Sequence, residues 1–425
     1  MNDNDREIRP PKLIAVLRRH DLLPAIVFLP TRRHCDEAAT EVSLDRSQPA
    51  DPERQRARSE MFEAFAAENP EILSHKHVKA LLQSGTASHH AGHIPAWKLI
   101  VEKMMSAGLL RAIFATSTVA AGVDFPARTV VISNTDTRGN DGWRPLRVSE
   151  LQQMTGRAGR RGRDNVGFVI LAPGRFQNPR KIAELLRSRP EALESRFRAT
   201  YTSLLNLLDA FSSFDRVREI TEKSFAFRGI ARRKDDPEKL AERIWQPFED
   251  RANVLGHFGY LDIESETVTE DGKWLANLRV DRPLLIGEAL RDGVFDELAI
   301  PEFAGMIAAV AADAERTYGE LRVSRRLDTA FDRLEAVVAR VSNIEWKYGV
   351  EVNEELNFSA AAAAERWAAG MEWSELTARS KAAEGDLVRL LSRTGEALRQ
   401  VGGLGLPASK LASEASTRLL REPVR

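Results

Sequence analysis

The residues best suited to chemistry are two arginines set among glycines, in the string Gln153-Met-Thr-Gly156-Arg157-Ala-Gly159-Arg160-Arg161-Gly162. Glycine lets a backbone approach a neighbouring group closely, and we expect Arg157 and Arg160 to share a helical turn and reach one anionic group. Arginine suits phosphate because its planar guanidinium binds oxygens bidentately and stays charged. The string therefore predicts a phosphate-binding loop, with a solvated basic turn as the alternative.

A second string, FATSTVAAGVDFPAR over residues 114–128, combines hydroxyls with Gly122 and Asp124. It leaves one apolar run and enters the next, at the carboxyl end of a strand where open α/β sheets bind ligands. We therefore predict a ligand-binding segment. The alternative is an ordinary strand–loop–helix connection in which Thr118 caps the helix.

Five of the eight histidines gather between residues 75 and 93. Neutral imidazoles three or four residues apart, as in His89, His90 and His93, can share a metal ion. No carboxylate or cysteine falls at a helpful spacing nearby, so we predict no metal site.

Short apolar runs alternate with helical patterns along the first 175 residues, which predicts a mainly parallel α/β sheet. The predicted strands are residues 25–30, 79–83, 111–116, 129–133 and 167–172. A helix is predicted from Pro95 to Gly108, because proline favours the first turn and glycine the end. The second half is predicted to be mostly helical, with Ala-rich segments near 304–314 and 359–369 and a charged connector at 231–240.

Composition limits the class of protein without deciding its partners. The 425 residues carry 62 Lys and Arg against 62 Asp and Glu, so net charge neither favours nor excludes nucleic acid. The single cysteine, Cys35, excludes an internal disulfide, and no apolar run has the roughly 20 residues that cross a bilayer. We predict a soluble cytoplasmic protein.

Two further segments are interpretable. Asp141-Gly142 predicts the two-residue turn of a hairpin, with a surface loop as the alternative. Residues 384–403 predict a helix that buries Leu387, Leu390, Leu391 and Leu398 and exposes Arg389, Arg393, Glu396 and Gln400. That exposed stripe is either a binding face or simply solvated.

Read in order, these strings resemble motifs IV, V and VI of the second RecA-like domain of superfamily-two helicases. The resemblance rests on AIVFLPTRRHCDEAA, SHHAG, GLLRAIFATSTVAAGVDFPARTVVI and DGWRPLRVSELQQMTGRAGRRG. It is strongest to the superkiller-type DExH branch, which includes RNA helicases and archaeal DNA-repair helicases. Residues 195–208 and SFAF at 224–227 resemble that branch's winged helix, and residues 255–298 resemble its DSHCT domain.

The resemblance implies a RecA-like parallel-sheet domain at 1–178, a winged helix at 179–232 and a helical DSHCT-like domain at 233–425. It implies that Arg157 and Arg160 stabilise the γ-phosphate of ATP and that Gln153 orients the nucleotide, with Gly122, Asp124 and Gly156 beside it. The nucleic-acid contacts that it implies are Thr31, Arg32, His90 and Thr118 on backbone phosphates, Trp143 and Arg144 on a duplex-splitting hairpin, and Arg389 and Arg393 on a ratchet helix near 384–400.

The sequence departs from a complete helicase in having only one RecA-like domain. It contains no GxxxxGK[ST] loop to cradle phosphates, and Asp36-Glu37 does not follow an apolar strand, so we predict that Asp36 lies on a helix surface. ATP and the ligands of Mg²⁺ would then be delivered by a missing N-terminal half, and this chain alone is predicted to be inactive. A fragment, a split gene product and an ATPase-dead module remain open.

The main hypothesis is thus an ATP-dependent helicase acting on single-stranded or partly duplex RNA. A DNA-repair helicase of the same branch is one alternative, because backbone contacts distinguish RNA from DNA only where a 2′-hydroxyl is recognised. A non-catalytic protein that holds single strands in a basic groove is the other.

Overall fold

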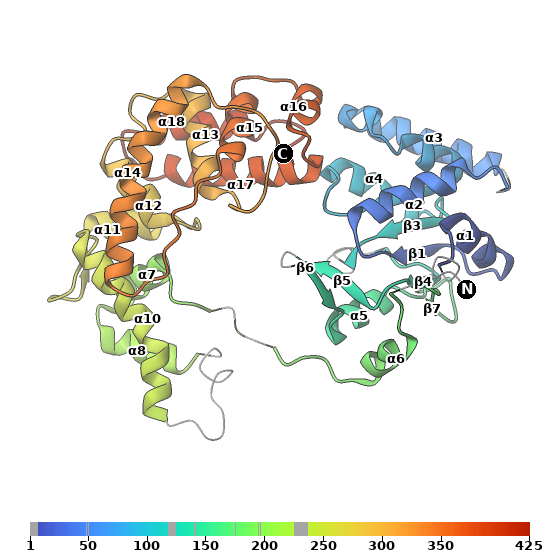
Figure 1. Cartoon of the computed structure of the whole chain (residues 1–425), viewed down its shortest axis with the longest axis horizontal. Helices are drawn as coiled ribbons and strands as arrows, with labels where there is room; N and C mark the ends of the chain where they lie inside the picture. The colour runs from blue at the N-terminus through green and yellow to red at the C-terminus, as the bar shows by residue number, and fades with distance from the viewer. Residues whose placement is uncertain are drawn as a thin grey trace. The chain divides into compact units, whose positions relative to one another are not determined.

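The computed structural model describes residues 7–47, 49, 51–117, 125–139, 142–174, 176–193, 195, 197–224 and 237–425. The chain divides into two compact units, Met1–Ala192 and Leu193–Arg425, which the colours of Figure 1 distinguish. Each unit is described by itself.

The first unit alternates strands and helices. In chain order its elements are α1 (Pro10–Arg19), β1 (Ala25–Phe28), α2 (Arg32–Leu44), α3 (Pro52–Ala66), a 3-10 helix (Pro70–Ser74), a π-helix (Ala80–Ser84), β2 (Thr86–His89), α4 (Pro95–Ser106), β3 (Ala112–Ala115), β4 (Thr129–Ile132), β5 (Asp136–Gly139), β6 (Gly142–Pro145), α5 (Val148–Thr155), β7 (Phe168–Leu171) and α6 (Pro179–Arg187).

A five-stranded sheet in the order β2-β3-β1-β4-β7 forms the centre of this unit, and every pair of neighbours is parallel. The predicted parallel α/β domain is therefore confirmed. Helices α1 and α2 pack together on one face, where Leu17 and Ala39 meet Val27 and Phe114 (Figure 1). Because strand side chains alternate, Ile26 and the other intervening residues face the opposite side.

The predicted strand at 79–83 is wrong. Residues Ala80–Ser84 form one π-helical turn that ends at Gly85, whose φ is +66°, and the strand begins only at Thr86. Short apolar runs do not distinguish strand from helix. The buried Arg58 side chain stabilises the turn by donating hydrogen bonds to the carbonyls of Leu82 and Gln83.

Parallel strands give the sheet two chemically different edges. Thr31 follows β1 and His90 follows β2, so both lie at the carboxyl edge. The β5–β6 hairpin follows β4 at that same edge, and α5 then returns the chain to the amino edge before β7. The loop between α5 and β7, which carries both candidate arginines, therefore lies at the amino edge.

The second unit is mainly helical, as predicted. Its elements are α7 (Tyr201–Phe211), α8 (Phe214–Glu222), α10 (Pro237–His257), β8 (Leu261–Asp262), β9 (Thr267–Val268), α11 (Glu270–Ala276), α12 (Pro283–Arg291), α13 (Ile300–Ala311), α14 (Arg325–Lys347), α15 (Phe358–Ala368), α16 (Trp373–Ser380), α17 (Glu384–Gly402) and α18 (Ser409–Leu419).

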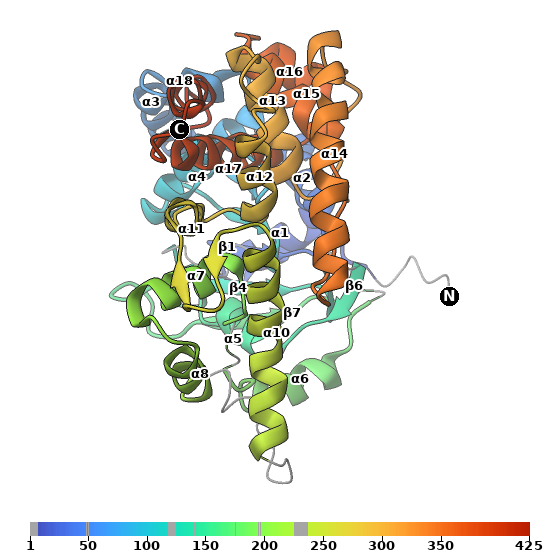
Figure 2. The ribbon, with the colours of Figure 1, turned by 90° about the vertical axis from the view of Figure 1, so that its left-hand side faces the viewer.

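Small residues allow the central helices of this unit to pack closely. Helix α13 lies against α15 and α17, and the alanines at 360–364 of α15 are completely buried. A Cβ on Gly305 would lie 3.0 Å from the carbonyl oxygen of Ala361, so glycine permits this approach. The long helix α14 packs along α12, as Figure 2 shows. Among the residues described, none of the helices is both long and apolar enough to span a membrane.

Candidate nucleotide and nucleic-acid interface

The arginine loop is joined to the amino edge of the sheet through its backbone. The amide of Ala127 donates to the carbonyl of Arg157 at 3.0 Å, and the amide of Gly159 donates back to Ala127 at 2.7 Å. A Cβ on Gly167 would lie 2.5 Å from the carbonyl carbon of Ala158. The close approach that the glycines permit is therefore to the chain's own backbone, and it fixes where the arginines emerge.

The expectation that Arg157 and Arg160 share a helical turn is wrong. Helix α5 ends at Thr155 with Gly156 as its C-cap, and the two arginines lie in the turns that follow. Gly159 has φ +89°, a left-handed conformation that a helix does not accept. Their relative placement comes from the loop and not from helical periodicity.

Arg160 forms a two-point ion pair with Asp164. Its Nε lies 2.7 Å from Oδ2 and its Nη2 lies 2.9 Å from Oδ1, while the Arg160 amide also donates to Oδ2 at 3.0 Å. The Arg160 side chain is 20% exposed and that of Asp164 is 3% exposed. The guanidinium of Arg160 lowers the pKa of Asp164 to about 2, so the pair is charged at neutral pH.

Beside this pair, Gln153 is exposed on α5 and Arg157 is partly buried, with interactions inside the protein. Gly156 also is exposed. The remaining predicted nucleotide contacts, Gly122 and Asp124, lie outside the described residues, as does Thr118.

At the carboxyl edge, Thr31 caps helix α2 by accepting a hydrogen bond from the amide of His34 at 3.2 Å. The amino end of this 13-residue helix, with Arg32 in its first turn, is a place where a phosphate is favoured by the helix dipole. The aliphatic stem of Arg32 packs against Gly92, where a Cβ would lie 3.2 Å from the Arg32 Cδ.

One turn further along α2, Asp36 collects hydrogen bonds from several segments. Its Oδ1 accepts from Ser88 Oγ at 2.7 Å, from His77 Nε2 at 2.9 Å and from His90 Nε2 at 3.0 Å, and its Oδ2 accepts from Lys76 at 2.6 Å. The prediction that Asp36 lies on a helix surface is therefore wrong, because its side chain is only 19% exposed. Its partners lie 40 or more residues away.

Burial alone would raise the pKa of Asp36. The hydrogen bonds from His77, His90, His93 and Lys76 more than offset this effect and hold the pKa well below its ordinary value. Asp36 is therefore an anion within a ring of donors.

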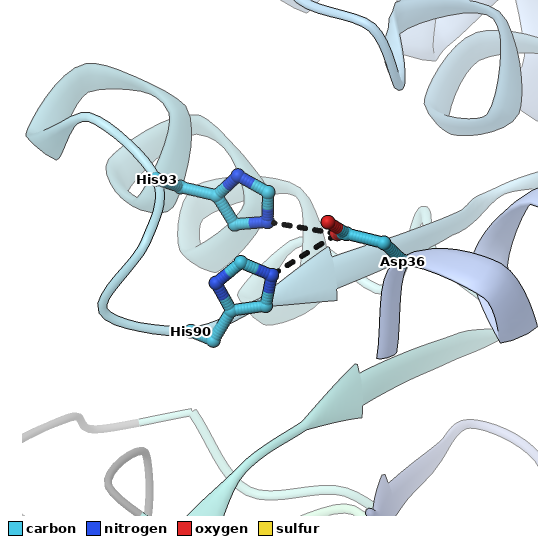
Figure 3. Close-up of side chains that lie close together, drawn as sticks. All are labelled: Asp36, His90 and His93. Carbon is cyan, nitrogen blue, oxygen red and sulfur yellow. Dashed lines mark hydrogen bonds and ion pairs between the residues drawn. The ribbon is translucent and has the colours of Figure 1, made fainter. Parts of the chain in front are cut away.

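Figure 3 shows His90 and His93 pointing at Asp36 from the segment that follows β2. The imidazole of His90 is 4% exposed and uses both nitrogens: Nε2 faces Asp36, and Nδ1 accepts from the Gly92 amide at 3.1 Å. A neutral His90 thus carries its proton on Nε2, which donates to Asp36. No ring nitrogen is left for a phosphate in this arrangement, so a role for His90 in strand binding must be indirect.

The same polarity runs through His75 and His93. The His77 amide donates to His75 Nδ1 at 3.3 Å, so a neutral His75 donates from Nε2 to His93 Nδ1 at 3.1 Å. His93 then carries its proton on Nε2, 2.8 Å from Ser88 Oγ and 3.5 Å from Asp36. Each proton in this chain is directed toward the carboxylate.

Asp36, His90 and His93 also have the separation expected of metal ligands, since their donor atoms all lie within 4.8 Å of one another. Coordination through Nε2 would move the proton of His90 to Nδ1, where it would face the N–H of Gly92. Metal-bound histidines normally donate their second N–H to an acceptor. The donor set therefore does not suit a metal, although the tertiary structure supplies the carboxylate that the sequence spacing lacked.

The predicted hairpin is confirmed, and the predicted turn residue Asp141 lies outside the described residues. Strands β5 and β6 are antiparallel and pair Gly139 with Gly142, so Gly142 belongs to the second strand and not to the turn. Trp143 is 56% exposed, whereas both Nη atoms of Arg144 donate to the carboxylate of Glu150, at 2.5 and 2.8 Å. The ring of Trp143 is thus open to a partner, and the Arg144 guanidinium is held against α5.

The amphipathic helix near the C-terminus is confirmed as α17, with Leu387, Leu390, Leu391 and Leu398 buried. The exposed Arg389 pairs with Asp386 at 2.8 Å, and Arg393 pairs with Asp281. Both predicted strand contacts of this helix therefore lie on its solvent face beside carboxylates.

Parts of the chain are similar to known proteins. Residues 265–425 match the family model described as the DSHCT (NUC185) domain. The chain is 38% identical over 223 residues to mouse Superkiller complex protein 2, 33% identical over 230 residues to the yeast antiviral helicase SKI2, and 32% identical over 255 residues to the human exosome RNA helicase MTR4.

These alignments cover 50%, 51% and 56% of this chain, in the same order. The chain is thus similar to the C-terminal region of Ski-type superfamily-two helicases. It spans only 17%, 17% and 24% of the lengths of those three relatives.

The most important hydrogen-bond and ion-pair partners of the candidate site residues were not predicted from the sequence. Asp164 carries a usable signal, because it stands four residues after Arg160, a spacing at which opposite charges commonly pair. The pairing of Glu150 and the hydrogen bonds of Asp36 have a weaker local signal in the sequence, or none. The hydrogen bond from His90 to Asp36 joins residues 54 positions apart, and no local pattern predicts it.

Proposed function

We propose that this chain forms the second RecA-like domain, winged helix and helical C-terminal domain of an ATP-dependent helicase acting on RNA. One observation carries the proposal: the glycine-fixed loop presents Arg157 and Arg160 at the amino edge of the sheet, and Thr31, Arg32 and Trp143 lie at the carboxyl edge. The relatives named as RNA helicases support RNA as the substrate.

Arg160 suits stabilisation of a transferring phosphoryl group. Asp164 engages Nε and Nη2 and leaves Nη1 outside the ion pair, so the carboxylate aims the guanidinium without occupying all of it. A guanidinium aimed in advance stabilises the charge that shifts toward the leaving oxygens without reorganising first. Gln153, exposed on the preceding helix, would orient the nucleotide, and Gly122, Asp124 and Gly156 would border it.

ATP would bind only when a P-loop domain supplied by another polypeptide segment meets this edge, because the 425 residues contain no P-loop. Mg²⁺ would neutralise phosphate charge and take its protein ligands from that domain. The chain alone would therefore be inactive, and closing and reopening the cleft would move its grip along the strand.

The strand-binding roles belong to the same proposal. Thr31, Arg32 and Thr118 would hold backbone phosphates, Trp143 would stack at the duplex junction, and Arg389 and Arg393 of α17 would contact the exiting strand. The proposed division is a RecA-like domain at 1–178, a winged helix at 179–232 and a DSHCT-like domain at 233–425, in a cytoplasmic protein.

The test is to supply the N-terminal P-loop portion of a Ski-type relative in trans and to measure ATP turnover with and without single-stranded RNA. We expect turnover only in the mixture, with stimulation by RNA. Arg160→Ala should lower turnover about 100- to 1,000-fold, whereas Arg161→Ala, an exposed neighbour, should leave it within about twofold. Equal effects of the two substitutions would remove the finger assignment.

A binding protein that holds strands without ATP is the second candidate, favoured by the missing P-loop. RNA affinity that stays the same with and without the P-loop portion and ATP, in every pairing, would support it. Unwinding of matched RNA and DNA duplexes by the mixture would separate an RNA helicase from a DNA-repair helicase.

A further inference from the structure

We propose that Asp36 is a positioning residue for strand binding: by fixing His90 and its loop against α2, it sets the direction in which Arg32 reaches a backbone phosphate. This inference rests on the proposed function and adds to it a residue that contacts neither nucleotide nor strand.

Asp36 and His90 are joined by a hydrogen bond 3.0 Å long between a partly buried carboxylate and a buried imidazole. The Gly92 amide fixes the other ring nitrogen, so the imidazole is held at both ends and cannot turn without losing a bond. Ser88 donates to the same carboxylate oxygen and His93 Nε2 lies 3.5 Å from it, which ties both ends of this segment to α2, and His77 adds a donor from a separate segment.

The loop after β2 that carries His90 also contacts Arg32. Gly92 lies between the His90 ring and the Arg32 stem: a Cβ there would be 3.0 Å from His90 Nδ1 and 3.2 Å from Arg32 Cδ. Arg32 and Asp36 are four residues apart on α2 and therefore lie on the same face. A displaced His90 loop would thus release the stem of Arg32.

The charges around Asp36 also suit an anionic ligand. Arg32 is at the amino end of α2, where the helix dipole already favours a phosphate. The charge of Asp36 is offset by the Lys76 ammonium 2.6 Å away, and its oxygens are already engaged by three histidines. Asp36 can therefore fix the loop without opposing an incoming phosphate.

The experiment measures the affinity of the full 425-residue chain for labelled oligouridylate over a range of salt concentrations. Arg32→Ala should weaken binding about tenfold and reduce the slope of log K against log salt by about 0.7, as expected for one lost phosphate contact. Asp36→Asn should reproduce both effects, because an amide oxygen is a weaker acceptor than a carboxylate for the donors of Ser88, His77 and His90, and the new N–H groups would face Lys76. Glu37→Gln, on the same helix but exposed, should change neither.

The double variant decides between positioning and general destabilisation. If Asp36 acts through Arg32, adding Asp36→Asn to Arg32→Ala should weaken RNA binding by a further factor of less than about two, because the two changes remove the same interaction. Gly92→Ala, which leaves Asp36 intact, should give a smaller loss that also disappears in the Arg32→Ala background. If the double variant loses RNA affinity equal to the sum of the two single losses in free energy, the proposal is overturned.

Two other results are informative. If Arg32→Ala leaves the affinity unchanged, the proposed strand contact itself fails. If the wild type binds Zn²⁺ in a one-to-one ratio, and EDTA weakens its RNA binding to the level of Asp36→Asn, the cluster is a metal site and the hydrogen-bond account is overturned.

Discussion

The two edges of the sheet hold their charged side chains in different ways. At the amino edge, Arg160 pairs with a carboxylate four residues away, and its side chain is 20% exposed. At the carboxyl edge, Asp36 accepts hydrogen bonds from residues 40 to 54 positions away, and the histidines among them are buried. A local pair joins neighbouring residues of one loop, whereas an acceptor of distant, buried donors joins segments that must move together.

This difference suits the two proposed roles. A residue that meets a triphosphate only when another domain arrives benefits from a partner that it can share or release. A surface that grips a strand in every cycle benefits from a fixed shape, which buried hydrogen bonds provide.

The largest expected effect breaks the carboxyl-edge network. Asp36→Ala removes the acceptor of three buried donors and should destabilise the first unit by about 3 kcal/mol, since buried donors without partners are costly. Urea unfolding followed by hydrogen exchange of the sheet amides measures this loss. Glu37→Gln is the control, and a loss below about 1 kcal/mol for Asp36→Ala would contradict the assigned network.

The next effect breaks the backbone contact at the amino edge. Gly167→Ala would place a Cβ 2.5 Å from the carbonyl carbon and oxygen of Ala158. Since both obstructing atoms are backbone, the loop must shift, and we expect a cost of about 2 kcal/mol. Gly162→Ala, which has open space around its Cβ, controls for a general effect of replacing glycine in this loop, apart from the strain of its φ of +75°.

A pH series should separate the two edges. Burial lowers the pKa of His75 to about 2 and that of His93 to about 3, from 6.5, with Lys76, His77 and His90 adding repulsion and Asp36 opposing the decrease. Between these values and 6.5 the unfolded chain binds more protons, so stability is complete above pH 6.5 and decreases as pH falls. Each group contributes a slope of at most about 1.4 kcal/mol per pH unit.

The Arg160–Asp164 pair behaves differently in the same series. The pKa of Asp164 is lowered from 3.8 to about 2, so its contribution is present above pH 3.8 and is lost only as pH falls toward 2. Asp164→Asn should therefore leave the slope between pH 4 and 6.5 unchanged, whereas His93→Asn should reduce it. Equal slopes for the wild type and His93→Asn would contradict the burial argument.

The smallest effect is the loss of the local pair itself. Asp164→Asn should cost about 1 kcal/mol, because the pair is partly exposed and the asparagine oxygen still accepts from the Arg160 amide. Thermal unfolding measures it. A cost as large as that of Asp36→Ala would show that the two edges do not differ.

Much of the fold was predictable because its signals are local. Apolar runs predicted β1, β3, β4 and β7, and the proline–glycine pattern predicted α4 within two residues of its observed end at Ser106. The strand β2 was displaced from the predicted run because a buried arginine, Arg58, stabilises a π-helical turn there through carbonyls that no local pattern identifies.

The sequence by itself determined the order of the motifs, the spacing of Arg157 and Arg160, the amphipathic α17 and the absence of a P-loop, since each depends on residues near one another in the chain. Only the tertiary structure decided that the arginines and Thr31 lie at opposite edges of the sheet, and that Asp36 is a partly buried acceptor of distant, buried donors. Strand order and hydrogen bonds across 54 residues depend on the packing of the whole domain, which spacing along the chain does not encode.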